Sequence, residues 1–217
     1  MCRTGAENGP GSNGTDACHG KTGAGTGHGI LCHGRGLKKI SRLYVEVFPC
    51  GSGEVFYMEI PADTRADLSE ELYKSLQTYA PELPQHLKLA NMAEFFSTEY
   101  GLTAANRILS EVLGILLTEY VRTPTQAFEK WVELPMQEIS EQDFFEAYAQ
   151  WMANTSSSRP AKELWSYYES RRRIVEVVTE EAPGSREKDG YRISGKRSKE
   201  RLEEMIRGAE NGKEEEN

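Results

Sequence analysis

The chain has 217 residues, which is enough for one domain with a sizeable core, or for one domain with tails. Its formal net charge is -8, and this balance excludes a protein that coats nucleic acid non-specifically, because such affinity comes from neutralising phosphates with basic side chains. Hydrophobic residues make up 38% of the chain and form no run as long as a membrane span, so we expect a cytoplasmic protein that does not enter a membrane.

The composition divides the chain into three zones. Residues 1–36 are rich in Gly, Thr, Ser, Asn and His and contain few large apolar side chains, so we expect a disordered tail. Residues 37–179 hold nearly all aliphatic and aromatic residues and are expected to form one folded α+β domain that is mostly helical. Residues 180–217 are polar and strongly charged, which predicts a mobile C-terminal segment with a short hairpin and a helix.

The folded zone begins with a predicted β-hairpin. Arg42–Phe48 and Glu54–Ile60 are rich in β-branched and aromatic residues, and the residues between them are typical of a turn. Pairing Phe48 with Glu54 leaves both faces mostly apolar, so we expect helices, other strands or a partner chain to cover the hairpin on both sides. One of these faces is the predicted interaction surface. It consists of Tyr44, Phe48, Phe56, Met58 and Ile60.

Apolar spacing predicts helices along the middle of the chain. We expect the first to begin at Asp67, and the next two to occupy about 85–100 and about 103–122. The second of these three regions also contains the start of a weak helix-turn-helix pattern around Gly101. An αα-hairpin is the better interpretation, because Arg107 falls where a recognition helix needs a buried aliphatic residue. The third is apolar around most of its circumference, which is typical of a central core helix.

Further helices are expected after Pro124, at Ser140 and near Pro160, and Ser140 has the clearest capping signal. The β-branched stretch 174–179 suits a strand or the end of a helix, and 191–194 is a candidate partner strand. The predicted fold is therefore α+β. An N-terminal β-hairpin, which C-terminal strands can extend, packs on a bundle of about five or six helices between disordered termini.

Thiol and imidazole groups in the N-terminal tail are the ligand types that zinc prefers. Their spacing fits no zinc finger or ribbon, and the surrounding glycines do not preorganise a site, so a disordered tail is the better interpretation. We therefore expect no cofactor. The residues that a metal would use are Cys18, His28, Cys32 and His33.

Residues for catalysis are scarce in the folded zone, which has one histidine, His86, and one cysteine, Cys50. A nucleophile and base pair would require the hairpin turn to contact the start of the second helix, and no pair of glutamates has a spacing that marks an acid and a base. We therefore expect a chain that is not an enzyme, and a hydrolase that uses Cys50 and His86 is the second alternative.

Basic residues gather at the two margins of the folded zone, which is otherwise acidic. If the chain ends meet, the two groups form one patch, and neighbouring aromatic residues suit stacking on single-stranded nucleic acid. The first alternative function is therefore a nucleic-acid-binding regulator. Its patch would consist of Lys38, Lys39, Arg42, Arg171, Arg172 and Arg173.

The leading hypothesis is a non-catalytic interaction or assembly protein, as a subunit or accessory factor of an intracellular complex. It rests on the hairpin with two apolar faces and on the aromatic-rich helices. Its expected partner is another protein or a second copy of the chain.

Overall fold

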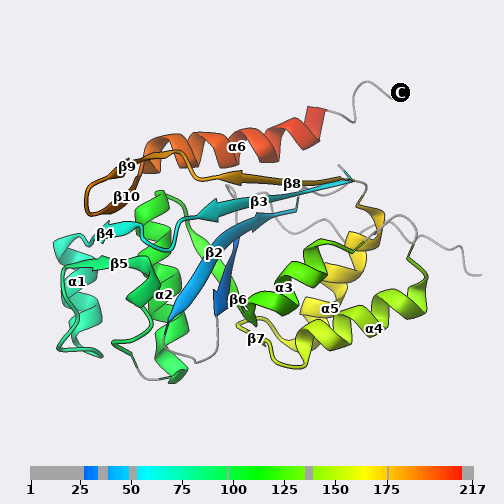
Figure 1. Cartoon of the computed structure of the whole chain (residues 1–217), viewed down its shortest axis with the longest axis horizontal. Helices are drawn as coiled ribbons and strands as arrows, with labels where there is room; N and C mark the ends of the chain where they lie inside the picture. Colours follow the sequence, from blue (N-terminus) through cyan, green and yellow to red (C-terminus); the bar gives the residue numbers. More distant parts are fainter. Residues whose placement is uncertain are drawn as a thin grey trace, which may run out of the picture.

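A six-stranded mixed sheet lies at the centre of the protein (Figure 1). The structure is a computed structural model, and it describes residues 27–33, 39–48, 53–96, 98–134, 139–174 and 176–211. The strand order is β7-β6-β1-β2-β3-β8; β1 pairs with β6 and β3 with β8 in parallel, and the other pairs are antiparallel. The strands are β1 (Gly27–His33), β2 (Ile40–Val47), β3 (Glu54–Ile60), β6 (Leu117–Pro124), β7 (Ser156–Ser157) and β8 (Glu176–Glu181).

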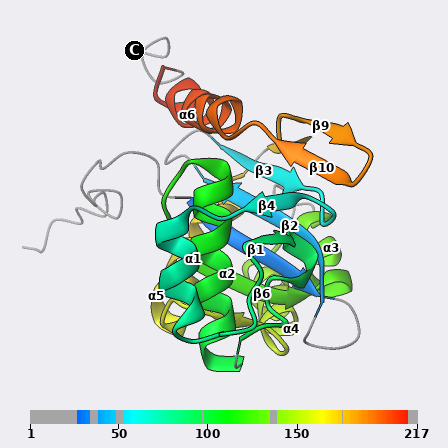
Figure 2. The same cartoon turned by 90° about the vertical axis from the view of Figure 1, so that its left-hand side faces the viewer.

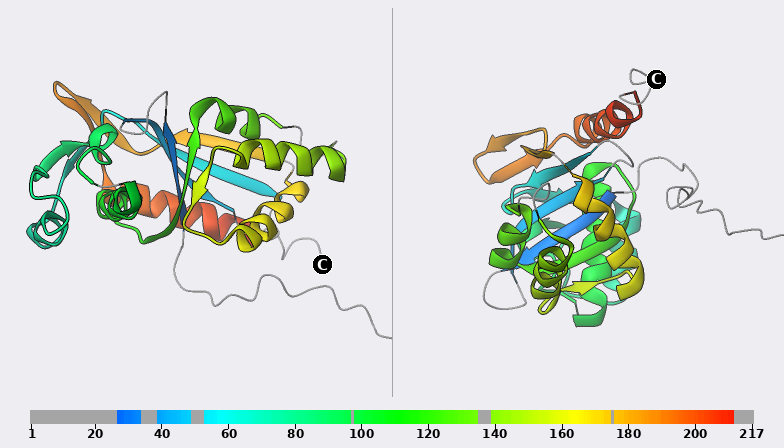
Figure 3. Two further views of the ribbon diagram at one scale, coloured as in Figure 1. Left: turned by 90° about the horizontal axis from the view of Figure 1, so that it is seen from below. Right: turned by 90° about the vertical axis from the view of Figure 1, so that its right-hand side faces the viewer.

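Helices cover both faces of this sheet. An aliphatic core lies between one face and three α-helices, α1 (Glu70–Gln77), α2 (Thr98–Leu113) and α6 (Gly195–Asn211). Figure 2 shows α1 and α2 side by side in front of the sheet. An aromatic core lies between the other face and α3 (Thr125–Val132), α4 (Glu141–Met152) and α5 (Ala161–Glu169), which Figure 3 shows from two sides.

Four short strands and two 3₁₀ helices complete the described elements. The strands β4 (Arg65–Asp67) and β5 (His86–Lys88) form one antiparallel ribbon, and β9 (Gly184–Glu187) and β10 (Gly190–Ile193) form another. The 3₁₀ helices are η1 (Leu89–Asn91) and η2 (Ser170–Arg173). Within the described ranges, no helix has the length and apolar character needed to cross a membrane.

The β2–β3 hairpin separates the two cores because its side chains alternate between faces. Val45 lies opposite Met58 on the aliphatic side, whereas Glu46 lies opposite Tyr57 on the aromatic side. Helices of the same chain therefore cover both apolar faces of the hairpin, without a partner chain.

The predicted pairing of Phe48 with Glu54 is wrong by one residue, since Val47 lies opposite Phe56. A one-residue shift exchanges the faces of one strand relative to the other. The pattern of apolar residues does not distinguish the two registers, because both bury apolar residues on both faces. The predicted interaction surface is consequently divided. Phe56, Met58 and Ile60 belong to the aliphatic core, whereas Tyr44 and Phe48 belong to the aromatic core.

Mixed α and β structure with six α-helices among the described residues agrees with the predicted class, but the helices form two layers around a sheet instead of one bundle. The predicted helix at 85–100 is largely wrong, because this stretch contains β5 and η1. The predicted helix at 103–122 ends early: α2 stops at Leu113, Gly114 has φ 67, and β6 follows. A continuous apolar run does not distinguish a helix from a buried strand.

Both predicted terminal zones contain described structure. Strand β1 lies within the expected tail 1–36 and pairs with β2 and β6. In the expected mobile segment 180–217, β10 pairs with β9 and not with 174–179, and α6 buries Leu202 and Met205 in the aliphatic core. The helix-turn-helix pattern is absent, because α2 continues through Gly101.

Candidate ligand-binding site

A buried carboxylate with three tyrosine partners lies in the aromatic core. Glu46 on β2 is 1% exposed. Its Oε2 accepts a hydrogen bond of 2.6 Å from the Tyr57 hydroxyl, and its Oε1 accepts bonds of 2.9 Å from Tyr167 and 3.1 Å from Tyr168. We call these four residues the Glu46 cluster. Three donors compensate much of the cost of burying the charge.

The cluster forms because three elements, β2, β3 and α5, place polar groups on the same side of the sheet. Glu46 and Tyr57 are direct cross-strand neighbours, and Tyr167 and Tyr168 are consecutive residues of α5. Sequence patterns do not predict this site. The detectable signal was a glutamate in the middle of an apolar strand, but its tyrosine partners on α5 are more than 120 positions away in sequence.

Arg171 of η2 is buried next to this cluster and has no acceptor among the described residues. The residue is 2% exposed, and its guanidinium carbon lies 5.0 Å from the centre of the Trp131 ring and 5.6 Å from that of Tyr57. In the part of the chain that the structure describes, none of its three nitrogen atoms has a hydrogen-bond partner, and the same is true of the buried Nε1 of Trp131. Buried donors are normally satisfied, so these two side chains mark a place where an added acceptor would be strongly stabilised.

Electrostatics keep the tyrosines of the cluster in their donating form. Burial raises the pKa of both Tyr167 and Tyr168 well above 10.0, and the negative charge of Glu46 raises each pKa further. Arg171 acts on the pKa of Tyr168 in the opposite direction. The hydroxyls are therefore neutral donors to Glu46 at physiological pH.

A groove of about 140 Å³ opens beside the cluster, between β2, β3 and α3. Its rings contact one another, with ring centres 5.0 Å apart for Tyr44 and Phe128, and 5.4 Å apart for Tyr57 and Phe128. Tyr57 also lies against Arg171, so one side chain links the groove to the unpartnered guanidinium. The groove is lined by Arg42, Tyr44, Tyr57, Phe128, Glu129, Val132, Glu133 and Thr179.

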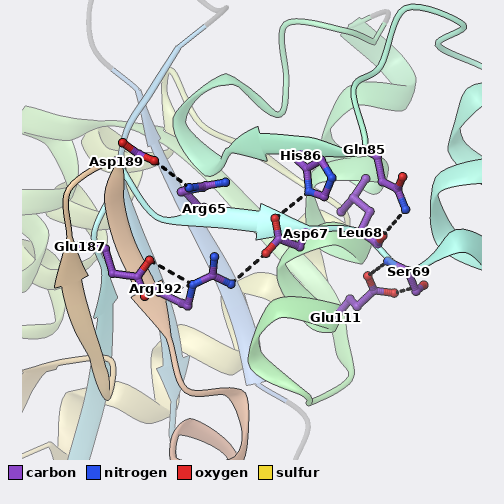
Figure 4. Close-up of polar contacts among 10 residues, drawn as sticks. All are labelled: Arg65, Asp67, Leu68, Ser69, Gln85, His86, Glu111, Glu187, Asp189 and Arg192. Carbon is purple, nitrogen blue, oxygen red and sulfur yellow. Dashed lines mark hydrogen bonds and ion pairs between the residues drawn. The ribbon is translucent and has the colours of Figure 1, made fainter.

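A second polar network lies on the surface, where the β9–β10 ribbon meets the β4–β5 ribbon (Figure 4). Asp67 accepts a bond of 2.8 Å from Arg192 and lies 2.8 Å from Nδ1 of His86. The hydrogen bonds from His86 and Arg192 lower the pKa of Asp67. Arg65 reaches Asp189 at 3.3 Å. These groups are partly exposed and form ion pairs that join the two ribbons. Their donors are therefore paired, unlike the buried guanidinium of Arg171.

The residues predicted to form a basic patch have different environments. Arg171 is buried, Arg42 pairs with Glu129 at 3.7 Å, and Arg172 pairs with Glu141 at 3.4 Å. Lys39 is exposed and directly precedes β2. Lys38 and the side chain of Arg173 lie outside the described part, so the proposed patch as a whole stays a prediction.

For most of the residues considered as metal ligands or as a nucleophile, the structure does not describe the side chains. Cys18 and Cys50 lie outside the described residues. For His28, Cys32 and His33 the structure describes only the backbone, in β1. His86 is on β5 and bonds to Asp67, so its pairing with Cys50 also stays a prediction.

No protein-family model matches the chain, and no curated protein matches its sequence. Solved structures with the same fold include protein gbs0355 from Streptococcus agalactiae, at 7% identity and a TM-score of 0.59, over 84% of this chain and 88% of that one. A protein from Eubacterium siraeum, whose assignment as a transcription regulator is itself provisional, is 8% identical with a TM-score of 0.58, over 95% of this chain and 100% of that one. TagT bound to LI-WTA is 9% identical with a TM-score of 0.52, over 85% of this chain and 90% of that one.

These identities establish a shared fold and nothing further. TagT is a wall teichoic acid transferase of the LytR-CpsA-Psr family, so this fold can support an enzyme. The expectation that the chain is not an enzyme is therefore wrong, because the absence of a recognisable catalytic pair in the sequence does not exclude catalysis on this fold. It relied on recognisable pairs in the sequence, whereas on this fold polar groups meet from distant elements, as Glu46 and Tyr168 do.

Proposed function

We propose that this chain binds an anionic amphiphile, with its acidic group at Arg171 and Trp131 and its apolar part along the groove beside α3. Binding of this kind is compatible with an enzyme, because a transferase must also hold its substrate. The proposal concerns the binding step.

The observation that carries the proposal is the pair of buried side chains without acceptors. An unpaired guanidinium in the interior costs several kcal/mol, and a protein retains such a cost most readily where a ligand compensates it. Arginine offers a planar set of donors that suits carboxylate and phosphate, and the indole N–H of Trp131 adds one more donor. A phosphate monoester has enough oxygen atoms to accept from both residues.

The groove supports an apolar chain next to the acidic group. Tyr44, Tyr57, Phe128 and Val132 give the groove an apolar side that suits hydrocarbon, and Glu129 and Glu133 are among its other lining residues. Glu129 at the rim is paired with Arg42, which reduces its repulsion of an anion. The complex of TagT with LI-WTA adds support at the level of the fold, because that neighbour also holds a ligand.

Dodecyl phosphate is a suitable probe, with inorganic phosphate as the head group alone and dodecyl maltoside as the chain alone. We expect the intrinsic tryptophan fluorescence to titrate with dodecyl phosphate at concentrations where the other two have little effect. Arg171→Met should weaken this binding by at least about tenfold, which corresponds to about 1.4 kcal/mol.

Arg172→Met is the matched control, since the neighbouring arginine is ion-paired to Glu141 on the surface, and it should bind like the wild type. Trp131→Phe removes the indole donor while keeping a ring, and should weaken binding by a smaller factor. Equal binding by wild type and Arg171→Met, or an absence of binding by the wild type, would reject the proposal.

The nucleic-acid-binding alternative has weaker support. The Eubacterium siraeum neighbour favours it at the level of fold alone, and three of the six proposed basic residues are buried or ion-paired. A nucleic-acid affinity that falls steeply with salt, and that is lost on replacing Lys39 and Arg172 together, would favour this alternative. The interaction and assembly hypothesis needs an exposed apolar surface. The exposed ring of Tyr79, which follows α1, is a candidate part of one.

A further inference from the structure

A row of aromatic rings lies where α1 ends and α2 begins, with Tyr79 exposed and with Phe96 and Tyr100 partly buried against the aliphatic core. Tyr79 is 57% exposed and stacks on Tyr100, with ring centres 4.1 Å apart and an angle of 24° between the planes. Phe96 continues the row, with its ring centre 6.2 Å from that of Tyr100. Single exposed apolar residues are common, but a contiguous row of rings at the surface usually marks a contact site.

The row borders a shallow groove of about 690 Å³. We call it the Tyr79 groove. It is lined by Tyr79, Ala80, Pro81, Glu82, Glu94 and Phe95. The groove is on the aliphatic-core side of the sheet, whereas Arg171 is on the aromatic-core side, so this inference does not depend on the proposed function.

The lining of the groove is acidic. Glu82 and Glu94 are exposed, and within the described ranges neither forms an ion pair or a side-chain hydrogen bond. No lysine or arginine is among the lining residues. A ligand of this groove therefore gains from a positive charge, both by pairing with the carboxylates and by a cation–π contact with Tyr79.

The exposed ring of Tyr79 and the carboxylates of Glu82 and Glu94 together suit one class of partner. Extended segments that contain proline pack their rings against exposed aromatic side chains at low entropic cost, because their backbone is already extended. An arginine or lysine that flanks the prolines would reach Glu82 or Glu94. We propose that the Tyr79 groove binds a basic, proline-containing extended segment of another protein.

The test uses three fluorescein-labelled peptides and fluorescence anisotropy on the full chain. The peptides are RPLPPLP, the acidic counterpart EPLPPLP and the glycine counterpart RGLGGLG. We expect RPLPPLP to bind, and the other two to bind at least about tenfold more weakly. High salt should weaken the binding of RPLPPLP, because surface charges are screened.

Variants separate the aromatic contribution from the charge contribution. Tyr79→Ala should weaken RPLPPLP binding by about tenfold or more. The double variant Glu82→Gln with Glu94→Gln should bind more weakly at low salt and lose the salt dependence, and it changes only exposed side chains. Phe145→Ala is the matched control, since Phe145 on α4 is also an exposed ring, at 56%, and should leave binding unchanged.

Three results would overturn the proposal. The first is no binding of RPLPPLP by the wild type at millimolar peptide. The second is equal binding of the acidic and basic peptides, and the third is wild-type binding by Tyr79→Ala. If the chain instead dimerises in sedimentation and Tyr79→Ala abolishes the dimer without any peptide binding, the groove belongs to a second copy of the chain and the peptide proposal fails.

Discussion

The aromatic core holds two buried charges whose surroundings differ. Glu46 accepts three hydroxyl donors, whereas Arg171 is surrounded by rings and has no acceptor. A buried ion without hydrogen bonds costs several kcal/mol, while a fully bonded one can stabilise the fold. At the scale of single residues, the hydrogen bonds of Glu46 contribute to stability, whereas Arg171 is the residue that we propose to bind the acidic group of a ligand.

Glu46→Gln should lower the free energy of unfolding by about 2–4 kcal/mol, because an amide replaces a carboxylate that accepts hydrogen bonds from three hydroxyl groups. Urea denaturation measures the change. Glu163→Gln, at an exposed position on α5, is the control and should change stability by less than about 0.5 kcal/mol. Equal effects of the two substitutions would contradict the role assigned to Glu46.

Alkaline pH should destabilise the protein through Tyr167 and Tyr168. Their pKa values are raised in the folded state, so the unfolded chain loses these protons first, from about pH 10 upward, and stability falls as pH rises towards the folded pKa. Below about pH 10 both states hold the protons, and the two tyrosines add no pH dependence. Phenolate absorbance during an alkaline titration checks this. If all tyrosines ionise together near pH 10 while the protein remains folded, the burial of these two is refuted.

The β9–β10 ribbon is attached to the β4–β5 ribbon by close backbone contact and by charge. Gly190 has φ 141, and a Cβ at this position would lie 2.4 Å from the carbonyl oxygen of Asp63. Arg192 pairs with Asp67 of the other ribbon and with Glu187 of its own ribbon (Figure 4). This attachment positions the ribbon that leads into α6.

Arg192→Met should loosen the β9–β10 ribbon without unfolding the sheet, because it removes both ion pairs of this side chain while the backbone contact at Gly190 remains. Hydrogen exchange should become faster at the amides of β9 and β10 and stay unchanged in β2 and β3. Lys188→Met, in the turn of the ribbon, is the control. Faster exchange throughout the sheet would show that the ribbon is not an independent element.

Local capping signals predicted the start of α4, whereas α1 begins at Glu70 after a Ser69 cap and not at the predicted Asp67. The Ser140 hydroxyl accepts a hydrogen bond of 3.1 Å from the Asp143 amide at the start of α4, as the capping pattern indicated. Residues 117–122 were assigned to a helix because their apolar character fits either state, and only pairing with the distant β1 makes them a strand. Elements that depend on remote partners could not be assigned from spacing.

At the scale of the whole molecule, the sheet separates an aliphatic core from an aromatic core that contains the polar groups. The sequence indicated that the hairpin would be covered on both sides, but not that the cover would be two separate layers. The candidate site was also hidden, since Glu46, Trp131 and Arg171 come from three distant elements and are brought together only by the strand order and the helices on that face.

The C-terminal helix is an integral part of this architecture and does not behave as a charged tail. Leu202→Ala should lower the free energy of unfolding by about 2–4 kcal/mol, because Leu202 is buried in the aliphatic core. Lys196→Ala on the exposed side of α6 should have an effect below about 0.5 kcal/mol. Urea denaturation compares the two, and a negligible effect of Leu202→Ala would mean that α6 is detached from the core in solution.

The indole N–H resonances of the three tryptophans give the most direct test of ligand binding at Arg171 and Trp131. In a ¹⁵N-labelled sample, dodecyl phosphate should move the Trp131 indole signal downfield as its free Nε1–H gains an acceptor. The Trp151 indole already donates to Thr123 at 2.9 Å and should move little. An unchanged Trp131 signal at saturating dodecyl phosphate, or an equal shift of all three indoles, would contradict binding at this site.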